Sequence, residues 1–279
     1  MPFPPVGSNR GAMDPLKPLI DNLNAEGRPR IWSLVITVFG DSVQHRGGRI
    51  ATARLSRLLG RIGVETGAVR TALSRLSQDG WVEGKRSGRT SSYTLTDRGL
   101  QEFGPATARI YAPPRQRPVG EWVFDWPGVE GALRLGQGSL RPAPVTDTPG
   151  GLRMTGALTG DAGAQVRASL DPDHAVALER MAQDLTALSG IDASPLDAAA
   201  ARLLQVHRWR RLVLRWPEVP AELMPEDAAP RDLRRAMAEA YKHLAPAAEA
   251  WLDTADGEMP AMPPAGPDFS LRFGGLQTP

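Results

Sequence analysis

The apolar positions in the first third of the chain recur at helical spacing and predict three helices. An apolar run over residues 31–39 predicts a buried first helix. Leucines at helical spacing predict a second helix over 53–59, and Thr52 would cap it. A third helix is expected from Thr66 to Asp79, with Gly80 as its stop signal.

The segments around these helices read as turns and short strands. Residues 41–48 predict a turn, 49–51 a short strand, and 60–65 a break in which Gly63 suits a left-handed turn. Two β-rich runs, 81–86 and 91–96, flank a Gly-containing connection and predict a hairpin, after which a helix resumes near Asp97. The order helix, strand, helix, turn, helix, hairpin is typical of a winged helix-turn-helix.

The remainder mixes short strands with longer helices. Strands are expected at 121–126, 152–158 and 165–170, and helices at 173–190, 196–216 and 231–253. We therefore predict an α+β protein with an N-terminal winged helix-turn-helix, a small central β-rich domain and a C-terminal helical domain. The expected boundaries are a flexible arm 1–27, the winged helix-turn-helix 28–104, a Pro-rich linker 105–118, a central α+β domain 119–192, a helical domain 193–256 and a Pro/Gly-rich tail 257–279.

Charge is segregated along the chain although the net charge is only +2. Residues 28–117 hold 16 Lys and Arg against 6 Asp and Glu, whereas residues 118–279 hold 15 against 22. A GC-rich genome would explain abundant Arg, Ala and Gly but not this segregation. A basic module joined to an acidic body favours binding of nucleic-acid phosphates by the basic part.

The third helix has a polar face without acids. Val69, Leu73 and Leu76 share the buried stripe, so five side chains with hydrogen-bonding groups face outward or flank that face. They are Arg70, Thr71, Ser74, Arg75 and Gln78. Such side chains contact base edges and phosphates, which favours DNA over an ordinary solvated face.

The predicted hairpin carries its own basic group. Lys85, Arg86 and Arg89 surround Gly88 at the tip. A basic tip can lie along a phosphate backbone or enter a minor groove, although charges at a turn also serve merely to protect an edge strand.

Two blocks of sequence resemble the phenylacetic-acid-degradation repressor (PaaX-like) family. They are RIWSLVITVFGDSVQHRGGRI with VRTALSRLSQDGWVEGKRSGRTSSYTLTDRG, and VHRWRRLVLRWPEVPAELMPED at 206–227. The resemblance implies a homodimeric repressor of an aromatic-acid catabolic operon, which binds an inverted repeat through the helix at 66–79 and the hairpin at 81–96. It also implies release from DNA by an aryl-acetyl-coenzyme A effector, typically phenylacetyl-CoA.

The central segment departs from the family pattern. A strand like EWVFDWP is followed in the family by an Arg-rich helix of a small ferredoxin-like domain, but here only residues 128–136 occupy that place before Gly-rich sequence. We therefore expect a shortened, degenerate ferredoxin-like domain.

A basic stretch near the C-terminus is a weaker candidate for effector binding. His207, Arg208, Arg211 and Arg215 could attract the phosphates of an acyl-CoA, or could form a solvated face paired with acids. Trp209 and Trp216 are expected in the core, and Arg153 and Arg167 receive no role.

Several classes of function lack support in the sequence. The chain has no cysteine, which excludes disulfides and Cys-ligated metals, and its four histidines lack metal-site spacing. No apolar run approaches the roughly 18 residues of a membrane span, and the N-terminus lacks a secretory signal, so we expect a cytoplasmic, non-enzymatic protein without cofactor or metal. Two alternatives remain open: an acyl-CoA thioesterase or metal-dependent nuclease in the C-terminal two-thirds, and a winged-helix module that binds proteins instead of DNA.

Overall fold

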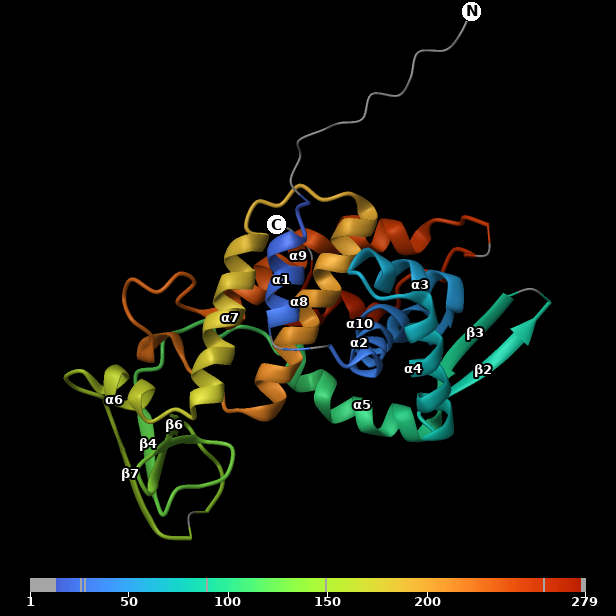
Figure 1. The fold of residues 1–279 in the computed structure, drawn as a ribbon. Helices are drawn as coiled ribbons and strands as arrows, with labels where there is room; N and C mark the ends of the chain where they lie inside the picture. The colour runs from blue at the N-terminus through green and yellow to red at the C-terminus, as the bar shows by residue number, and fades with distance from the viewer. Residues whose placement is uncertain are drawn as a thin grey trace, which may run out of the picture.

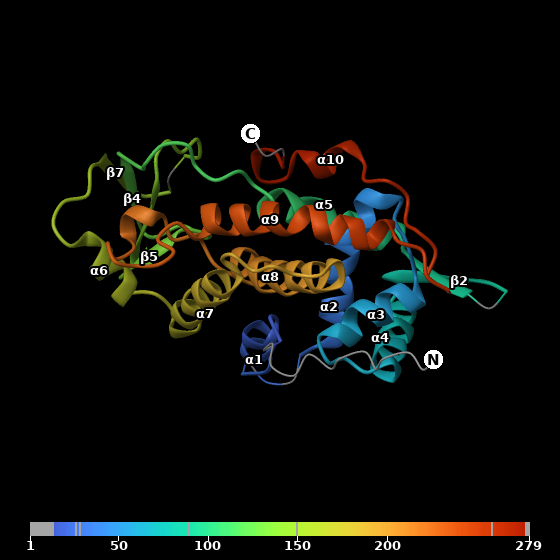
Figure 2. The ribbon, with the colours of Figure 1, turned by 90° about the horizontal axis from the view of Figure 1, so that it is seen from above.

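The computed structural model places two long helices through the centre of the molecule. It describes residues 14–25, 27, 29–88, 90–148, 150–257 and 259–276. Helices α8 (Pro195–Arg215) and α9 (Leu233–Asp253) lie side by side, and the two sheets lie at opposite ends of the molecule (Figure 1, Figure 2). In both views the hairpin β2–β3 projects away from the body. Among the described residues, no helix combines the length and hydrophobicity needed to cross a bilayer.

The N-terminal module, at residues 28–104, forms its helices and strands in the predicted order. Helices α2 (Ile31–Val38), α3 (Thr52–Arg61) and α4 (Thr66–Gln78) are followed by strands β2 (Val82–Ser87) and β3 (Thr90–Leu95). The short strand β1 (Arg49–Ala51) completes an antiparallel sheet of order β1-β3-β2. The helices pack around one apolar core, because their leucines and valines recur at helical spacing and so lie on one face of each helix.

Two local predictions about this module are wrong. Residues 41–48 were expected to form a turn, but a π-helical turn η1 (Phe39–Val43) and a 3-10 turn η2 (Gln44–Arg46) extend α2, because the backbone keeps right-handed helical angles through Gln44 and becomes left-handed only at Gly47, with φ 79°. Thr52 does not cap α3, since it lies inside the helix and its hydroxyl donates to the Ser91 carbonyl at 3.0 Å. Gly63, in contrast, adopts the expected left-handed conformation at φ 84°.

Helix α5 (Asp97–Ile110) links this module to the rest. It begins where predicted, with the Thr96 hydroxyl accepting a hydrogen bond from the Gly99 amide. It continues through Pro105 to Ile110, so residues 105–110 are helical where the composition predicted the beginning of a linker.

The second sheet is small, antiparallel and four-stranded. Its strands are β4 (Trp122–Trp126), β5 (Leu133–Leu135), β6 (Gly138–Pro142) and β7 (Leu152–Gly156), in the order β5-β6-β4-β7. The sequence predicted β4 and β7 but not β5 and β6. The buried Asp125 carboxylate on β4 pairs with Arg141 and Arg153 of the neighbouring strands at 2.9 and 2.6 Å, which gives both arginines a structural contact.

Segments expected to be strand or loose chain are helical. Residues 165–170 were predicted as a strand, but α6 (Ala162–Ala168) forms because the Asp161 side chain accepts from the Ala164 amide and caps it. The predicted arm contains α1 (Lys17–Ala25), whose leucines pack into the core near α7 (Pro172–Leu188). The predicted tail contains α10 (Pro267–Ser270) and the 3-10 turn η4 (Arg272–Gly274).

Two apolar clusters run across the predicted boundaries. One cluster contains residues of the four helices α1, α2, α3 and α4, of the N-terminal half of α8 and of the C-terminal half of α9. The other joins the end of α5, the four-stranded sheet, α7 and the opposite halves of α8 and α9. The central helix pair therefore serves as packing surface for both ends of the molecule.

Candidate nucleic-acid interface

Helix α4 presents a polar face held from behind by apolar side chains. Val69, Ala72, Leu73 and Leu76 are buried, at spacings of three and four residues. The helix ends in a Schellman motif: the Gly80 amide donates to the Ser77 carbonyl at 3.1 Å and the Trp81 amide to the Leu76 carbonyl at 2.8 Å, with Gly80 at φ 73°. The predicted stop at Gly80 is thereby confirmed.

The outward face of α4 consists of the side chains that the periodicity selected. Arg70, Thr71, Ser74, Arg75 and Gln78 are all exposed. The Thr71 hydroxyl donates to the Gly67 carbonyl at 3.0 Å, which leaves its lone pairs available to an outside donor. The exposed acids on this helix and next to it are confined to its two ends, at Glu65 and Asp79.

The hairpin beside α4 adds exposed cations. Lys85 and Arg86 lie on β2 and are both exposed, as is Gly88 at φ 59°. Arg89, the third predicted cation, lies outside the described residues. The acid Glu83 is also exposed on β2, where its carboxylate accepts from the Thr94 hydroxyl at 3.2 Å. The two described cations thus lie nearer the tip than this acid.

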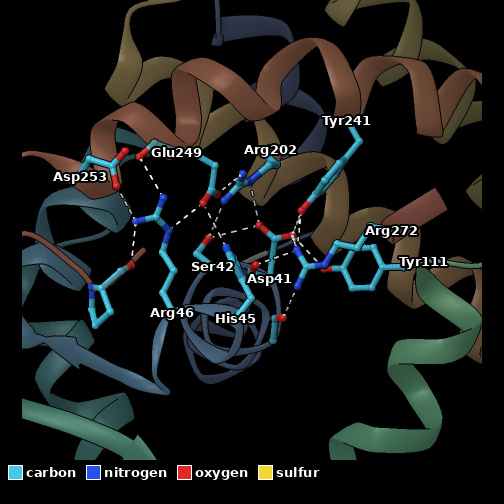
Figure 3. Close-up of polar contacts among 12 residues, drawn as sticks. Asp41, Ser42, His45, Arg46, Tyr111, Arg202, Tyr241, Glu249, Asp253 and Arg272 are labelled. Atoms are coloured by element: carbon cyan, nitrogen blue, oxygen red, sulfur yellow. Dashed lines mark hydrogen bonds and ion pairs between the residues drawn. The ribbon is translucent and has the colours of Figure 1, made fainter. Parts of the chain in front are cut away.

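A buried network of charged and polar side chains fixes this module to the helix pair (Figure 3). At its centre the Asp41 carboxylate accepts hydrogen bonds from the Tyr111 and Tyr241 hydroxyls, both at 2.8 Å. It also pairs with Arg202 at 2.9 Å and Arg272 at 3.1 Å. Burial raises the pKa of Asp41, but the two guanidinium groups outweigh burial and hold it below its ordinary value.

The network continues toward the end of α9. Glu249 pairs through one oxygen with Arg202 at 2.6 Å and through the other with Arg46 at 2.7 Å, and Arg46 reaches Asp253 at 2.7 Å. A separate anchor lies on α3, where the buried Arg54 donates to the Trp251 carbonyl at 2.8 Å and lies over the indole of that tryptophan. The module therefore lies in a fixed position against α8 and α9.

The sequence did not reveal this network. A signal was present in the apolar run of α8, AAAARLLQV, where one arginine interrupts buried positions. A charge in the middle of such a run must find a buried partner. The identity of the partners could not be inferred, because the two carboxylates that pair with Arg202, those of Asp41 and Glu249, lie 161 and 47 residues away in the chain.

The four residues proposed for effector phosphates do not share one surface. His207 and Arg208 are buried: the His207 Nδ1 lies 3.0 Å from the Thr37 hydroxyl, and Arg208 pairs with Asp184. Arg211 and Arg215 are exposed, and Arg215 pairs with Asp173 at 3.2 Å. Trp209 is in the core, as predicted, and its indole N–H donates to the Ile110 carbonyl at 2.8 Å.

Two buried histidines should make the folded chain less stable at acidic pH. Burial lowers the pKa of His174 to about 4 and, together with nearby arginines, that of His207 to about 3. Below the unfolded value of 6.5 the unfolded chain takes up protons that the folded chain does not, so stability falls as pH falls. The loss for each histidine should approach about 1.4 kcal/mol per pH unit as pH falls well below 6.5, where the unfolded imidazole is fully protonated.

Urea unfolding between pH 6.5 and 5 measures this slope. His174→Gln should flatten it, whereas His243→Gln, at an exposed position, should not. A free energy of unfolding that stays constant over this interval would contradict the assignment of neutral buried imidazoles.

Comparison with known proteins gives matches to both the N-terminal module and the helical part of this chain. Residues 30–99 match the family described as PaaX-like protein, and residues 173–254 match the PaaX-like protein C-terminal domain. The transcriptional repressor PaaX of Escherichia coli (strain K12) is 30% identical over 88% of this chain and 90% of its own length. This chain belongs to the PaaX-like family. Residues 30–99 include α4 and the β2–β3 hairpin, and 173–254 include the central helix pair.

Proposed function

We propose that this PaaX-like chain is a DNA-binding transcriptional repressor whose reading unit is a winged helix-turn-helix within residues 30–99. Helices α3 and α4 would form the helix-turn-helix, and β2–β3 the wing. The observation that carries this proposal is the face of α4, which exposes two arginines and three uncharged polar side chains without an intervening acid. Side chains of these types read base edges in the major groove and contact phosphates.

The relative named as a transcriptional repressor supports the same function, as does the match of residues 30–99 to its family. We further propose that the chain acts as a homodimer on an inverted repeat, because two-fold symmetry in the protein requires matching half-sites in DNA. Its effector would be an aryl-acetyl-CoA, in line with the family resemblance, and its target an aromatic-acid catabolic operon.

The four-stranded sheet would be the degenerate central domain. Its strand order equals that of a ferredoxin-like sheet, but loops replace the helices that such a domain has between β4 and β5 and between β6 and β7.

Selection of bound sequences from random duplexes by the full chain tests the proposal. Enrichment of a two-fold repeat, followed by footprinting of both half-sites, is the expected result. If no duplex is retained at moderate salt, the function as a DNA-binding repressor fails and the protein-binding alternative gains support. Turnover of phenylacetyl-CoA, or Mg²⁺-dependent nicking of DNA, would instead support an enzyme.

Contacts between the wing and DNA phosphates should affect how strongly DNA affinity depends on salt. If Lys85 and Arg86 each contact a phosphate, Lys85→Ala and Arg86→Ala should each lower the slope of log affinity against log salt by about one unit. Arg89→Ala is expected to act in the same way. Arg231→Ala, at an exposed position just before α9, is the matched control and should leave the slope unchanged. A wild-type slope in all three wing variants would exclude phosphate contacts by the wing.

A further inference from the structure

The C-terminal segment at residues 259–276, which we call the strap, is anchored on the body of the molecule. It leaves the end of α9 beside the N-terminal module and turns back to α10 (Figure 2). Near its start the Met262 amide donates to the Leu252 carbonyl of α9 at 3.0 Å. Near its end the Phe273 amide donates to the Tyr111 carbonyl, just after α5, at 2.8 Å. Met262 belongs to one apolar cluster and Phe273 to the other, so the strap is held at both ends.

The strap also contacts the N-terminal module, first at α3. The Arg54 side chain of α3 is fully buried and donates to the Pro260 carbonyl of the strap at 2.9 Å. It donates as well to the Trp251 carbonyl of α9 at 2.8 Å. None of the described carboxylates pairs with Arg54, so backbone carbonyls supply the acceptors that its buried charge requires. The position of α3 therefore depends on the course of the strap.

A second group of contacts lies at η2. The Arg46 Nη1 donates to the Pro263 carbonyl at 3.0 Å, and the Gly266 amide donates to the His45 carbonyl at 2.6 Å. The Phe269 ring stacks on the His45 imidazole, with 4.3 Å between centroids and 13° between planes. The middle of the strap is thus bonded to the module through both backbone and side chains.

The last group of contacts lies where α2 continues into η1. Arg272 donates to the Gly40 carbonyl at 3.2 Å and to the Asp41 carbonyl at 2.9 Å. The strap therefore touches α3, η2 and η1 of the module while both of its ends are fixed on the body. Apolar packing of the module on α8 and α9 is non-directional, whereas hydrogen bonds have preferred angles and define an orientation.

We propose that the strap is a positioning segment that sets the orientation of the winged helix-turn-helix on α8 and α9. In a dimer this orientation determines the distance and rotation between the two recognition helices, and hence the spacing of half-sites that the dimer accepts. This inference rests on the proposed function as a dimeric DNA-binding repressor. Loss of the strap contacts would leave the affinity for a single half-site unchanged, because α4 keeps its exposed face, but would relax the preference for one spacing.

Distances between spin labels test the orientation without DNA. The chain has no cysteine, so Ser77→Cys on α4 and Glu239→Cys on α9, both exposed, carry the labels. Double electron–electron resonance should give a narrow distance distribution in the otherwise wild-type chain. Arg54→Met combined with Phe269→Ala removes contacts from two parts of the strap and should broaden or shift this distribution. Leu271→Ala is the matched control on the same strap, because its side chain is 70% exposed, and should leave the distribution narrow.

DNA affinity tests the effect on half-site spacing. Fluorescence anisotropy is measured on the selected inverted repeat, on a single half-site, and on a repeat with two added base pairs, which rotate one half-site by about 70°. The wild-type chain should lose about tenfold or more in affinity on this insertion, and the Arg54→Met/Phe269→Ala chain less than about threefold. Both chains should bind the single half-site equally. Loss of stability alone would not produce this pattern.

A disulfide between the strap and the module should reverse the effect. A Cβ added at Gly47 would lie 3.8 Å from the Cβ of Pro263, which is the usual separation in a disulfide. In the Arg54→Met/Phe269→Ala chain, Gly47→Cys with Pro263→Cys should restore the wild-type response to spacing when oxidised and lose it again on reduction. Gly47 has φ 79°, which strains a cysteine, so Gly47→Cys alone in the same background is the control.

The outcomes separate the strap from the proposed function. If the label distributions of Phe269→Ala and of the double variant both match that of the wild type, with folding verified by urea unfolding, the proposal is overturned. Should the double variant not fold, Phe269→Ala alone decides. A broadened distribution with a wild-type response to spacing overturns the role in spacing. If the wild-type chain binds no duplex, the proposed function fails, whereas the label distances still decide whether the strap positions the module.

Discussion

Replacing Arg70 and Arg75 with alanine is expected to abolish sequence-specific DNA binding while leaving the fold intact. Each arginine is exposed on the acid-free face of α4. A bidentate arginine–guanine contact discriminates by about 1–3 kcal/mol, so each single variant should lose roughly 5- to 150-fold in affinity and the double variant more. Fluorescence anisotropy with the selected duplex measures the loss.

Stability and specificity controls separate this effect from unfolding. Exposed substitutions of this kind change the free energy of unfolding by within about 0.5 kcal/mol, so thermal melting should be nearly unchanged. Arg231→Ala should bind DNA as the wild type does. If Arg70→Ala and Arg75→Ala both retained wild-type affinity for the selected site, α4 would not be the recognition helix.

Replacing Asp41 with asparagine is expected to destabilise the folded chain by about 3–5 kcal/mol, as breaking a buried ion pair commonly does. The substitution leaves Arg202 fully buried and Arg272 nearly so without the carboxylate that both contact. Urea unfolding monitored by tryptophan fluorescence measures the difference. Asp21→Asn is the matched control, because its ion pair with Lys17 is exposed at both ends and is worth no more than about 1 kcal/mol.

A double-mutant cycle tests whether the loss arises from this network. Asp41→Asn combined with Arg272→Met should cost less than the sum of the two single changes, because the second substitution removes a charge that the first left uncompensated. Additive losses would show that the two residues do not interact energetically. The lowered pKa of Asp41 adds a pH signature: its contribution is present above the unfolded value near 4 and is lost as pH falls through the folded value.

The sequence predicted local elements well where a single segment carries the signal. Leucine spacing and Gly80 located α4 to within one residue of its end, and the same spacing selected its exposed face. Strands β5 and β6 were missed because β5 has only three residues and because Gly136 and Gly138, beside β5 and at the start of β6, interrupt the apolar pattern. Residues 165–170 were assigned to a strand, although the cap formed by Asp161 decides the helix α6.

The residues predicted to bind the effector show what helical spacing does not reveal. Four basic positions were selected on α8 by charge and helical spacing, but His207 and Arg208 contribute to the core, while Arg211 and Arg215 are exposed. Helical spacing shows which residues share a face of one helix. It does not show which other helices cover that face.

Local signals in the sequence were enough to predict the order of elements in residues 30–99, the polar face of α4 and the segregation of charge, because periodicity, turn residues and composition act over short stretches of chain. The partners of Asp41, the burial of Arg272 and the burial of His207 and Arg208 became clear only from the packed structure. These features join segments as much as 231 residues apart, and their energies depend on burial and distance, which exist only once α8 and α9 have packed against both ends of the molecule.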